Sequence, residues 1–249
     1  MIEFSALLLA QIVGINFTAA FLQASSGLGY AVLSMALMPL FLPLKTCSAI
    51  SAAGALVIAA QMSVILRKNI NFRIIAVPVA CCLLSINLGM YILLHAPEKT
   101  MRLVLASLII LLAVFFIVTQ KREIIIQNTV RNGILFGLVA GVATGMFNII
   151  GPFLSVYYFS TSKDNLGYKA NLEFSFLLTT AYTSILHIVY GNLNAQVLPF
   201  ALGSAAAAVA AGFIGLHLYK KINSKILKRV IYVFLPLVAL ILIKDMLPF

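Results

Sequence analysis

The sequence predicts an all-α, polytopic membrane protein with two inverted-topology repeats, formed by about eight full transmembrane helices plus interrupted or re-entrant helices. Three observations lead to this prediction. The composition is 63% hydrophobic and only 9% charged, which excludes an ordinary soluble domain. A long apolar stretch near the middle of the chain is interrupted by polar and helix-breaking residues. Short motifs also recur at nearly constant spacing along the chain.

Apolar segments separated by short polar connections run from one end of the chain to the other. We expect a single transmembrane domain over residues 1–249. The first segment lacks a basic start and a small-residue cleavage site, so we expect a retained helix and not a signal peptide. The expected spans are Phe4–Leu22, Ala24–Leu42, Thr46–Leu66, Ile74–Leu94, Leu103–Thr119, Leu172–Tyr190, Val197–Leu218 and Val230–Leu247.

The apolar stretch Gly133–Ser160 does not fit a simple span. A crossing helix needs about 20 apolar residues and two crossings need about 40, so a stretch of about 28 fits neither. Asn148, Gly151 and Pro152 interrupt it near its middle. Broken backbone at membrane depth survives only where protein or a polar cavity surrounds it. We therefore expect two short pieces, as an interrupted span or a re-entrant hairpin, at a functional site.

The basic residues predict the orientation. With these spans, Lys45, Lys99, Arg102 and Lys244 lie on one side, and the other 13 of the 17 Lys and Arg residues lie opposite. The positive-inside rule makes the rich side cytoplasmic and places both termini outside the cytoplasm. The net charge of +11 then reflects topology and attraction to the lipid bilayer, and no nucleic-acid partner is expected.

An internal repeat is the third observation. Asn69-Ile-Asn71 reappears as Asn192-Leu-Asn194, and Gly89 lies opposite Gly212, both at a spacing of 123. We expect repeat one over about 4–119 and repeat two over about 133–247. Each half has an odd number of pieces, so the halves are inverted relative to each other, as in secondary transporters. The break at Asn148–Pro152 then has a partner at Gln23–Gly29.

These features resemble the sulfite exporter TauE/SafE family. The shared pattern is a glycine-rich break in each half, a lysine after a short loop, an N-x-N turn and a small-residue span ending in a basic segment. It is clearest in YGNLNAQVLPFALGSAAAAVAAGFIGLHLYKKINSKILKRVI, while the first break, SSGLGYAVL, has fewer glycines than is usual in the family. The resemblance implies a bacterial cytoplasmic (inner) membrane transporter of sulfite or organosulfonates.

A site for such an anion is expected where the two breaks approach each other. Helix N-termini offer free N–H groups and roughly half a positive charge each, and hydroxyl and amide side chains add donors. Alternatively, the same residues only satisfy the broken helix ends. We expect no catalytic residue, metal or cofactor. The candidate substrate-binding residues are Gln23, Ser25, Ser26, Gly27, Gly29, Asn148, Gly151 and Pro152.

Glu173 and His187 are candidates for coupling transport to a proton or cation. They share one helix face with Thr180 and Ser184, and a polar stripe in a membrane helix is typical of an ion pathway. Alternatively, Glu173 pairs with Lys169 at the cytoplasmic edge and His187 faces water. A proton could also travel on the substrate.

The sequence motifs favour a transporter over an enzyme. The chain has no H-E-x-x-H and no G-x-S-x-G motif, which argues against an enzyme. An anion channel and a transporter of a different small organic anion stay open as alternatives, as does an oligomer.

Glycines at every fourth position, Gly133, Gly137, Gly141 and Gly145, share one helix face before the break. We expect close helix packing there, with sliding or gating as the alternative.

Overall fold

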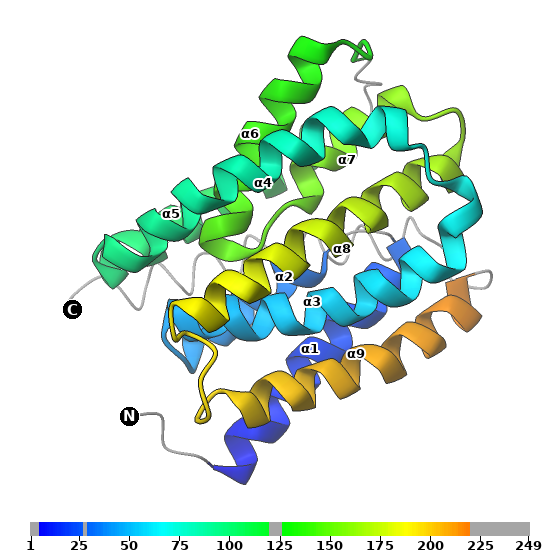
Figure 1. Cartoon of the computed structure of the whole chain (residues 1–249). Coiled ribbons are helices and arrows are strands. Elements are labelled where there is room, and N and C mark those ends of the chain that lie inside the picture. The colour runs from blue at the N-terminus through cyan, green and yellow to red at the C-terminus, as the bar shows by residue number, and fades with distance from the viewer. Residues whose placement is uncertain (1–4, 27–28, 120–125, 220–249) are drawn as a thin grey trace.

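The structure, a computed structural model, describes residues 5–26, 29–119 and 126–219. All regular elements in these ranges are helical (Figure 1). Six helices in them are long and apolar enough to cross a membrane: α1 (Ala6–Ser26), α3 (Leu44–Leu66), α4 (Phe72–His95), α6 (Val130–Phe147), α8 (Asn165–Val189) and α9 (Leu198–Tyr219). The other elements are α2 (Tyr30–Leu37), α5 (Glu98–Thr119), α7 (Gly151–Thr161) and the single 3₁₀ turns η1 (Met38–Leu40) and η2 (Arg67–Asn69).

The helices form three groups across the molecule. In Figure 1, α4, α6 and α7 lie on one side, α1 and α9 lie on the other, and α3 and α8 lie between them. The most extensive helix–helix contacts are α4 with α6, α1 with α9, and α3 with α8. The short helices α2 and α7 pack on α3 and α8 respectively, so both end up near the centre of the bundle.

Capping residues begin several of these helices. The side chains of Asn71, Thr129 and Asp164 accept hydrogen bonds from backbone N–H groups in the first turns of α4, α6 and α8. The bond from Gly167 N to Asp164 Oδ1 is the shortest of the three at 2.7 Å. Such caps satisfy N–H groups that have no partner inside the helix, and each contributes about 0.5–2 kcal/mol.

The predicted span Ala24–Leu42 is wrong. Helix α1 continues to Ser26, and α2 begins only at Tyr30 and is eight residues long, with η1 after it. Gly29 adopts a left-handed backbone with φ of 119°, which an L side chain rarely tolerates, so the chain changes direction there. Pro39 then shortens the other end, because proline has no N–H to continue a helix.

The stretch Gly133–Ser160 is broken near its middle, as predicted, but its two pieces are unequal. Helix α6 begins at Val130 and is 18 residues long, enough for a crossing, while α7 has 11 residues. Asn148 ends α6 in the left-handed conformation with φ of 57°, a helix C-terminus that asparagine tolerates. Pro152 lies in the first turn of α7, where its missing N–H costs nothing. The predicted span Val230–Leu247 lies outside the described residues.

The glycines of α6 pack against α4. A Cβ added at Gly137 would meet Pro78, one at Gly141 would meet Cys82 and Ser85, and one at Gly145 would meet Ile86. The glycine face therefore lets the two backbones approach closely, which is the packing role that the spacing predicted.

Candidate functional site

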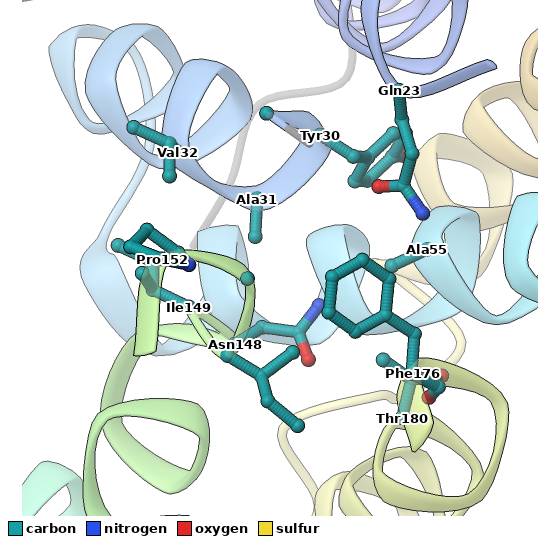
Figure 2. Close-up of a pocket in the computed structure, with 13 residues that line it drawn as sticks. Gln23, Tyr30, Ala31, Val32, Ala55, Asn148, Ile149, Pro152, Phe176 and Thr180 are labelled. Carbon is teal, nitrogen blue, oxygen red and sulfur yellow. Dashed lines mark hydrogen bonds between the residues drawn. The ribbon is translucent and has the colours of Figure 1, made fainter. Parts of the chain in front are cut away.

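A pocket lies where the two helix breaks meet. The pocket is partly open, with about 310 Å³ of empty space including its opening to solvent, and five segments line it: the end of α1, the start of α2, α3, the α6–α7 break and α8. Figure 2 shows the side chains of α1, the break and α8 projecting toward this space. The lining residues are Gln23, Gly29, Tyr30, Ala31, Val32, Ala55, Asn148, Ile149, Ile150, Gly151, Pro152, Phe176 and Thr180.

Two helix N-termini line the pocket without a side-chain cap. The residues that precede α2 and α7, Gly29 and Ile150, supply no side-chain hydrogen bond to the helix that follows. The first N–H groups of a helix have no partner within the helix itself. Both starts can therefore donate hydrogen bonds to a ligand, and each adds a partial positive charge.

Asn148 brings a weakly bonded amide group to the same pocket. Its side chain is 1% exposed, and its Nδ2 makes one long contact, 3.5 Å, with Ser51 Oγ of α3. Its Oδ1 has no hydrogen-bond partner. A buried amide oxygen without a donor costs free energy, on the order of 1–3 kcal/mol. To bind an anion, the amide must present its NH₂ group, whose present contact with Ser51 is long, and it can do so by turning over because its two ends have similar volumes.

Gln23 connects the pocket to a buried charged pair. Its Nε2 donates a hydrogen bond of 2.9 Å to Glu173 Oε2, and Glu173 is fully buried. One turn earlier on α8, Lys169 Nζ donates to the backbone oxygen of Ala24, 2.8 Å away, and also interacts electrostatically with Glu173. The lysine therefore lies at the negative end of α1, where a cation is favoured. Glu173 is buried beside the pocket and not exposed at the helix end.

The structure brings five of the eight predicted binding residues to this pocket: Gln23, Gly29, Asn148, Gly151 and Pro152. Ser25 is not among them. It faces α9, because a Cβ at Gly215 would lie 3.4 Å from its Oγ, and that Oγ donates to Phe21 O. The side chain of Ser26 and residue Gly27 lie outside the described part of the chain. Binding itself stays a prediction for all eight.

His187 does not face water. The imidazole is fully buried, and its Nε2 is 3.2 Å from Ser48 Oγ of α3. Its Nδ1 is 3.1 Å from Asn192 Nδ2 in the turn after α8. Because the asparagine nitrogen can only donate, Nδ1 accepts and Nε2 carries the proton that Ser48 accepts. His187 thus joins α3, α8 and the following turn.

Eight of the 13 lining residues were not among the predicted binding residues, and three of these have aromatic or hydroxyl side chains: Tyr30, Phe176 and Thr180. Thr180 was on the predicted polar stripe of α8, and Phe176 lies one turn before it, so their spacing from Glu173 was the signal. Tyr30 had no such signal. Its hydroxyl donates to Asn16 Oδ1 of α1 over 2.6 Å, which ties the start of α2 to the middle of α1.

The arrangement can hold a small anion by dipoles and hydrogen bonds. No Lys or Arg is among the described lining residues, and Lys169 of α8 is bonded at the end of α1. Among the described residues, no group of three or more His, Cys, Asp and Glu side chains is placed to hold a metal ion.

A family model described as sulfite exporter TauE/SafE matches residues 12–242. No curated protein and no solved structure matches the chain.

Proposed function

The chain belongs to the sulfite exporter TauE/SafE family, and from this premise we propose that it transports sulfite or an organosulfonate through the pocket between its two helix breaks. The family and the six apolar helices make the chain a multi-pass membrane protein and imply a transporter of sulfite-type anions, not an enzyme. The bacterial inner membrane is the proposed location.

One observation carries the choice of site. Two uncapped helix N-termini and the amide of Asn148, whose Nδ2 donor makes only one long contact, meet in one pocket. Each N-terminus is equivalent to roughly half a positive charge, so two together offset about one negative charge. Gly29 and Gly151 keep side chains out of the way where the backbone must approach the anion.

Matching hydrogen bonds support two homologous halves. Ser34 of α2 bonds Ser51 of α3 over 3.0 Å, and Tyr158 of α7 bonds Ser175 of α8 over 2.8 Å. Both members of the second pair lie 124 residues after those of the first. In each half, the bond ties the short helix after the break to the long helix that follows.

The N-x-N turns give a second match. Asn71 Oδ1 accepts from the N–H two residues later at the start of α4, and Asn194 Oδ1 does the same before α9. These two asparagines are 123 residues apart. The paired α1–α9 and α4–α6 contacts fit the same internal symmetry. This supports inverted repeats over about 4–119 and 133–247 in a single transmembrane domain.

Alternating access between the halves is supported by polar contacts that α8 makes near both of its ends with the first half. At one end, His187 bonds Ser48. At the other, the N–H of Asn71 donates to Asn171 Oδ1 over 2.7 Å. Each contact joins one half to the other, so each can open while the other stays closed. We propose that they close the outer and inner entrances to the pocket.

The proposed orientation has support from which loops lie together. Lys45 Nζ donates to Leu94 O, and Arg102 donates to Pro39 O, so these predicted outer segments share one end of the molecule. Asn71 and Asn171 bring predicted cytoplasmic segments together at the other. Extracytoplasmic termini follow if this assignment holds.

Substitutions of Asn148 test the site. Asn148→Gly removes the amide and keeps the left-handed backbone relaxed, and Asn148→Asp adds a negative charge at the same place. We expect radiolabelled sulfite uptake into proteoliposomes to fall about tenfold or more in N148G, as expected for about 1.4 kcal/mol of lost binding. N148D should lose more, because the new charge repels an anion.

The matched controls are Asn165→Gly and Asn165→Asp at an exposed position on α8, which should transport like the parent. Uptake by N148G equal to that of the parent would show that the amide is not part of the site. An increase in N148D would indicate a cationic substrate.

The alternatives are an anion channel and a transporter of another small organic anion. A transporter saturates at low flux and exchanges substrate across the membrane, whereas a channel does not. Competition of labelled sulfite uptake by thiosulfate, sulfoacetate, taurine and carboxylates identifies the substrate class.

A further inference from the structure

We propose that Glu173 is a proton-binding site and that Gln23 transmits its charge state to the anion pocket. The inference rests on the proposed function and adds to it the coupling ion and the path of coupling. The protein would then carry a proton and an anion in the same direction.

The first step is the contact between the two side chains. Glu173 Oε2 accepts a hydrogen bond of 2.9 Å from Gln23 Nε2. An ionised carboxylate can only accept, so it holds the glutamine amide with its nitrogen toward Glu173. The amide oxygen of Gln23 is then the atom on the other side, and Gln23 lines the pocket. An oxygen lone pair there disfavours an anion.

A proton on Glu173 reverses the direction of its hydrogen bond with Gln23. A neutral carboxyl group has an O–H that must donate, and the oxygen of Gln23 is an acceptor within reach. The amide can satisfy this bond by turning over, because its O and NH₂ groups occupy similar volumes. Its NH₂ group then points to the pocket, where it donates to an anion. Protonation thus converts a repelling group into a binding group.

The surroundings of Glu173 accommodate a neutral carboxyl. Its second oxygen, Oε1, is buried without a hydrogen-bond partner, which is costly for a charge. Lys169, on the same helix, interacts with Glu173 electrostatically and donates to Ala24 O. From α1 it is faced by Gln23.

The titratable side chains of the other elements packed against α8 are either exposed or engaged with groups other than Glu173. The exposed ones are Lys45, Arg67, Lys68, Arg73, Tyr91, His95 and Arg131. Those bonded to or packed against other groups are Tyr157 (with Asn128), Tyr158 (with Ser175), Cys47 (with Leu42 O), and Cys81 and Cys82 (against α6).

The coupling is reciprocal. If a proton on Glu173 strengthens anion binding about tenfold, a bound anion strengthens proton binding by the same factor. The protein should therefore change between its outward-open and inward-open forms mainly when it is empty or when it holds both the proton and the anion. Uptake of the anion should follow an inward proton gradient.

Proteoliposomes containing the full-length protein test this. Exchange of radiolabelled sulfite is measured in vesicles loaded with sulfite, without a gradient and at several pH values, and accumulation is measured in vesicles without internal sulfite under an inward proton gradient. Glu173→Gln imitates the neutral carboxyl, and Asp164→Asn makes the same chemical change at the exposed cap of the same helix, where the amide oxygen can still accept from Gly167.

An inward gradient of about one pH unit limits one-to-one symport to about tenfold accumulation. We expect the parent and D164N to approach this limit and to exchange sulfite faster as the pH falls. E173Q should still exchange sulfite, at a rate that no longer follows the parent's pH dependence, and should not accumulate it. Because sulfite itself takes up a proton, variants are compared at the same pH.

Several results would overturn the inference. Accumulation by E173Q equal to that of the parent would mean that the proton travels on sulfite or through another group. Exchange by the parent with no response to the gradient would remove proton coupling and leave the proposed function standing. No exchange by the parent would refute the proposed function, and the inference with it.

A second variant covers failure of E173Q to fold, detected as loss of a monodisperse peak in size-exclusion chromatography. Gln23→Met keeps the side-chain length and removes the amide. It should bind sulfite more weakly and lose the gradient response, whereas Gln196→Met, at an exposed position, should keep both. A parental gradient response in Q23M would also overturn the inference.

Discussion

A single methyl group on the glycine face of α6 should measurably destabilise the protein. In Gly141→Ala, the added Cβ would lie 2.9 Å from the carbonyl carbon of Cys82 and closer still to its oxygen and to Ser85 Oγ. Ordinary contacts begin at 3.4 Å, so α4 must retreat by at least about 0.5 Å. Gly14, on α1, has no atom within 4 Å of its Cβ position and provides the matched control.

Two effects oppose each other, and packing should prevail. Overpacking a tight interface costs about 1–3 kcal/mol, and the blocking atoms are largely backbone, so the upper half of that range applies. Replacing glycine by alanine in a helix returns about 0.5–1 kcal/mol. The net loss in G141A is about 1–2.5 kcal/mol, whereas G14A should be neutral or slightly stabilised.

Thermal unfolding of the purified protein in detergent measures the difference. At about 2–4 °C per kcal/mol for a chain of this size, G141A should lower Tm by about 2–10 °C. G14A should leave Tm unchanged or raise it. If G141A and G14A shift Tm equally, the helices are not in close contact at Gly141 and the face has another role, such as sliding.

Three further predictions follow from contacts between the long helices and their neighbours. Tyr158→Phe removes the hydrogen bond to Ser175 and should lower the free energy of unfolding by about 0.5–1.5 kcal/mol, measured by thermal unfolding. The double variant Tyr158→Phe/Ser175→Ala should lose less than the sum of the two single variants, and a loss equal to that sum would contradict the pairing. Asn194→Ala removes the cap before α9 and should cost about 0.5–2 kcal/mol, while Asn194→Asp, which keeps the acceptor, should cost less. His187→Leu should open the proposed outer entrance. A cysteine introduced at Thr180 should then react faster with a membrane-impermeant thiol reagent added from outside. An unchanged labelling rate would exclude His187 as part of that entrance.

Much of the fold could be read from local patterns. Hydropathy separated the spans, since an apolar helix of about 20 residues is a requirement of the bilayer. Asn148, Gly151 and Pro152 located the break between α6 and α7, because their backbone preferences act on their own position. The segment Ala24–Leu42 was misjudged for the same reason: it is apolar throughout, and hydropathy does not register the left-handed turn at Gly29.

The candidate site could be located in part. The two breaks were identified as partners, and the structure does bring Gln23 and Asn148 to one pocket. Ser25 was grouped with Gln23 because they are neighbours in sequence. Residues two apart on a helix point about 200° away from each other, so when one faces the pocket the other faces away. The helical period predicts that Gln23 and Ser25 lie on opposite faces of α1. It does not predict which of the two faces lines the pocket.

The sequence by itself determined the membrane class, the break between α6 and α7 and the glycine face, because each depends on residues close together in the chain. Only the tertiary structure decided which distant groups meet. Gln23 bonds Glu173 across 150 residues, and Asn148 contacts Ser51 across 97. These contacts depend on how each helix is rotated about its own axis and at what depth it packs. Both are set by close packing of whole helices against each other, which no local pattern contains.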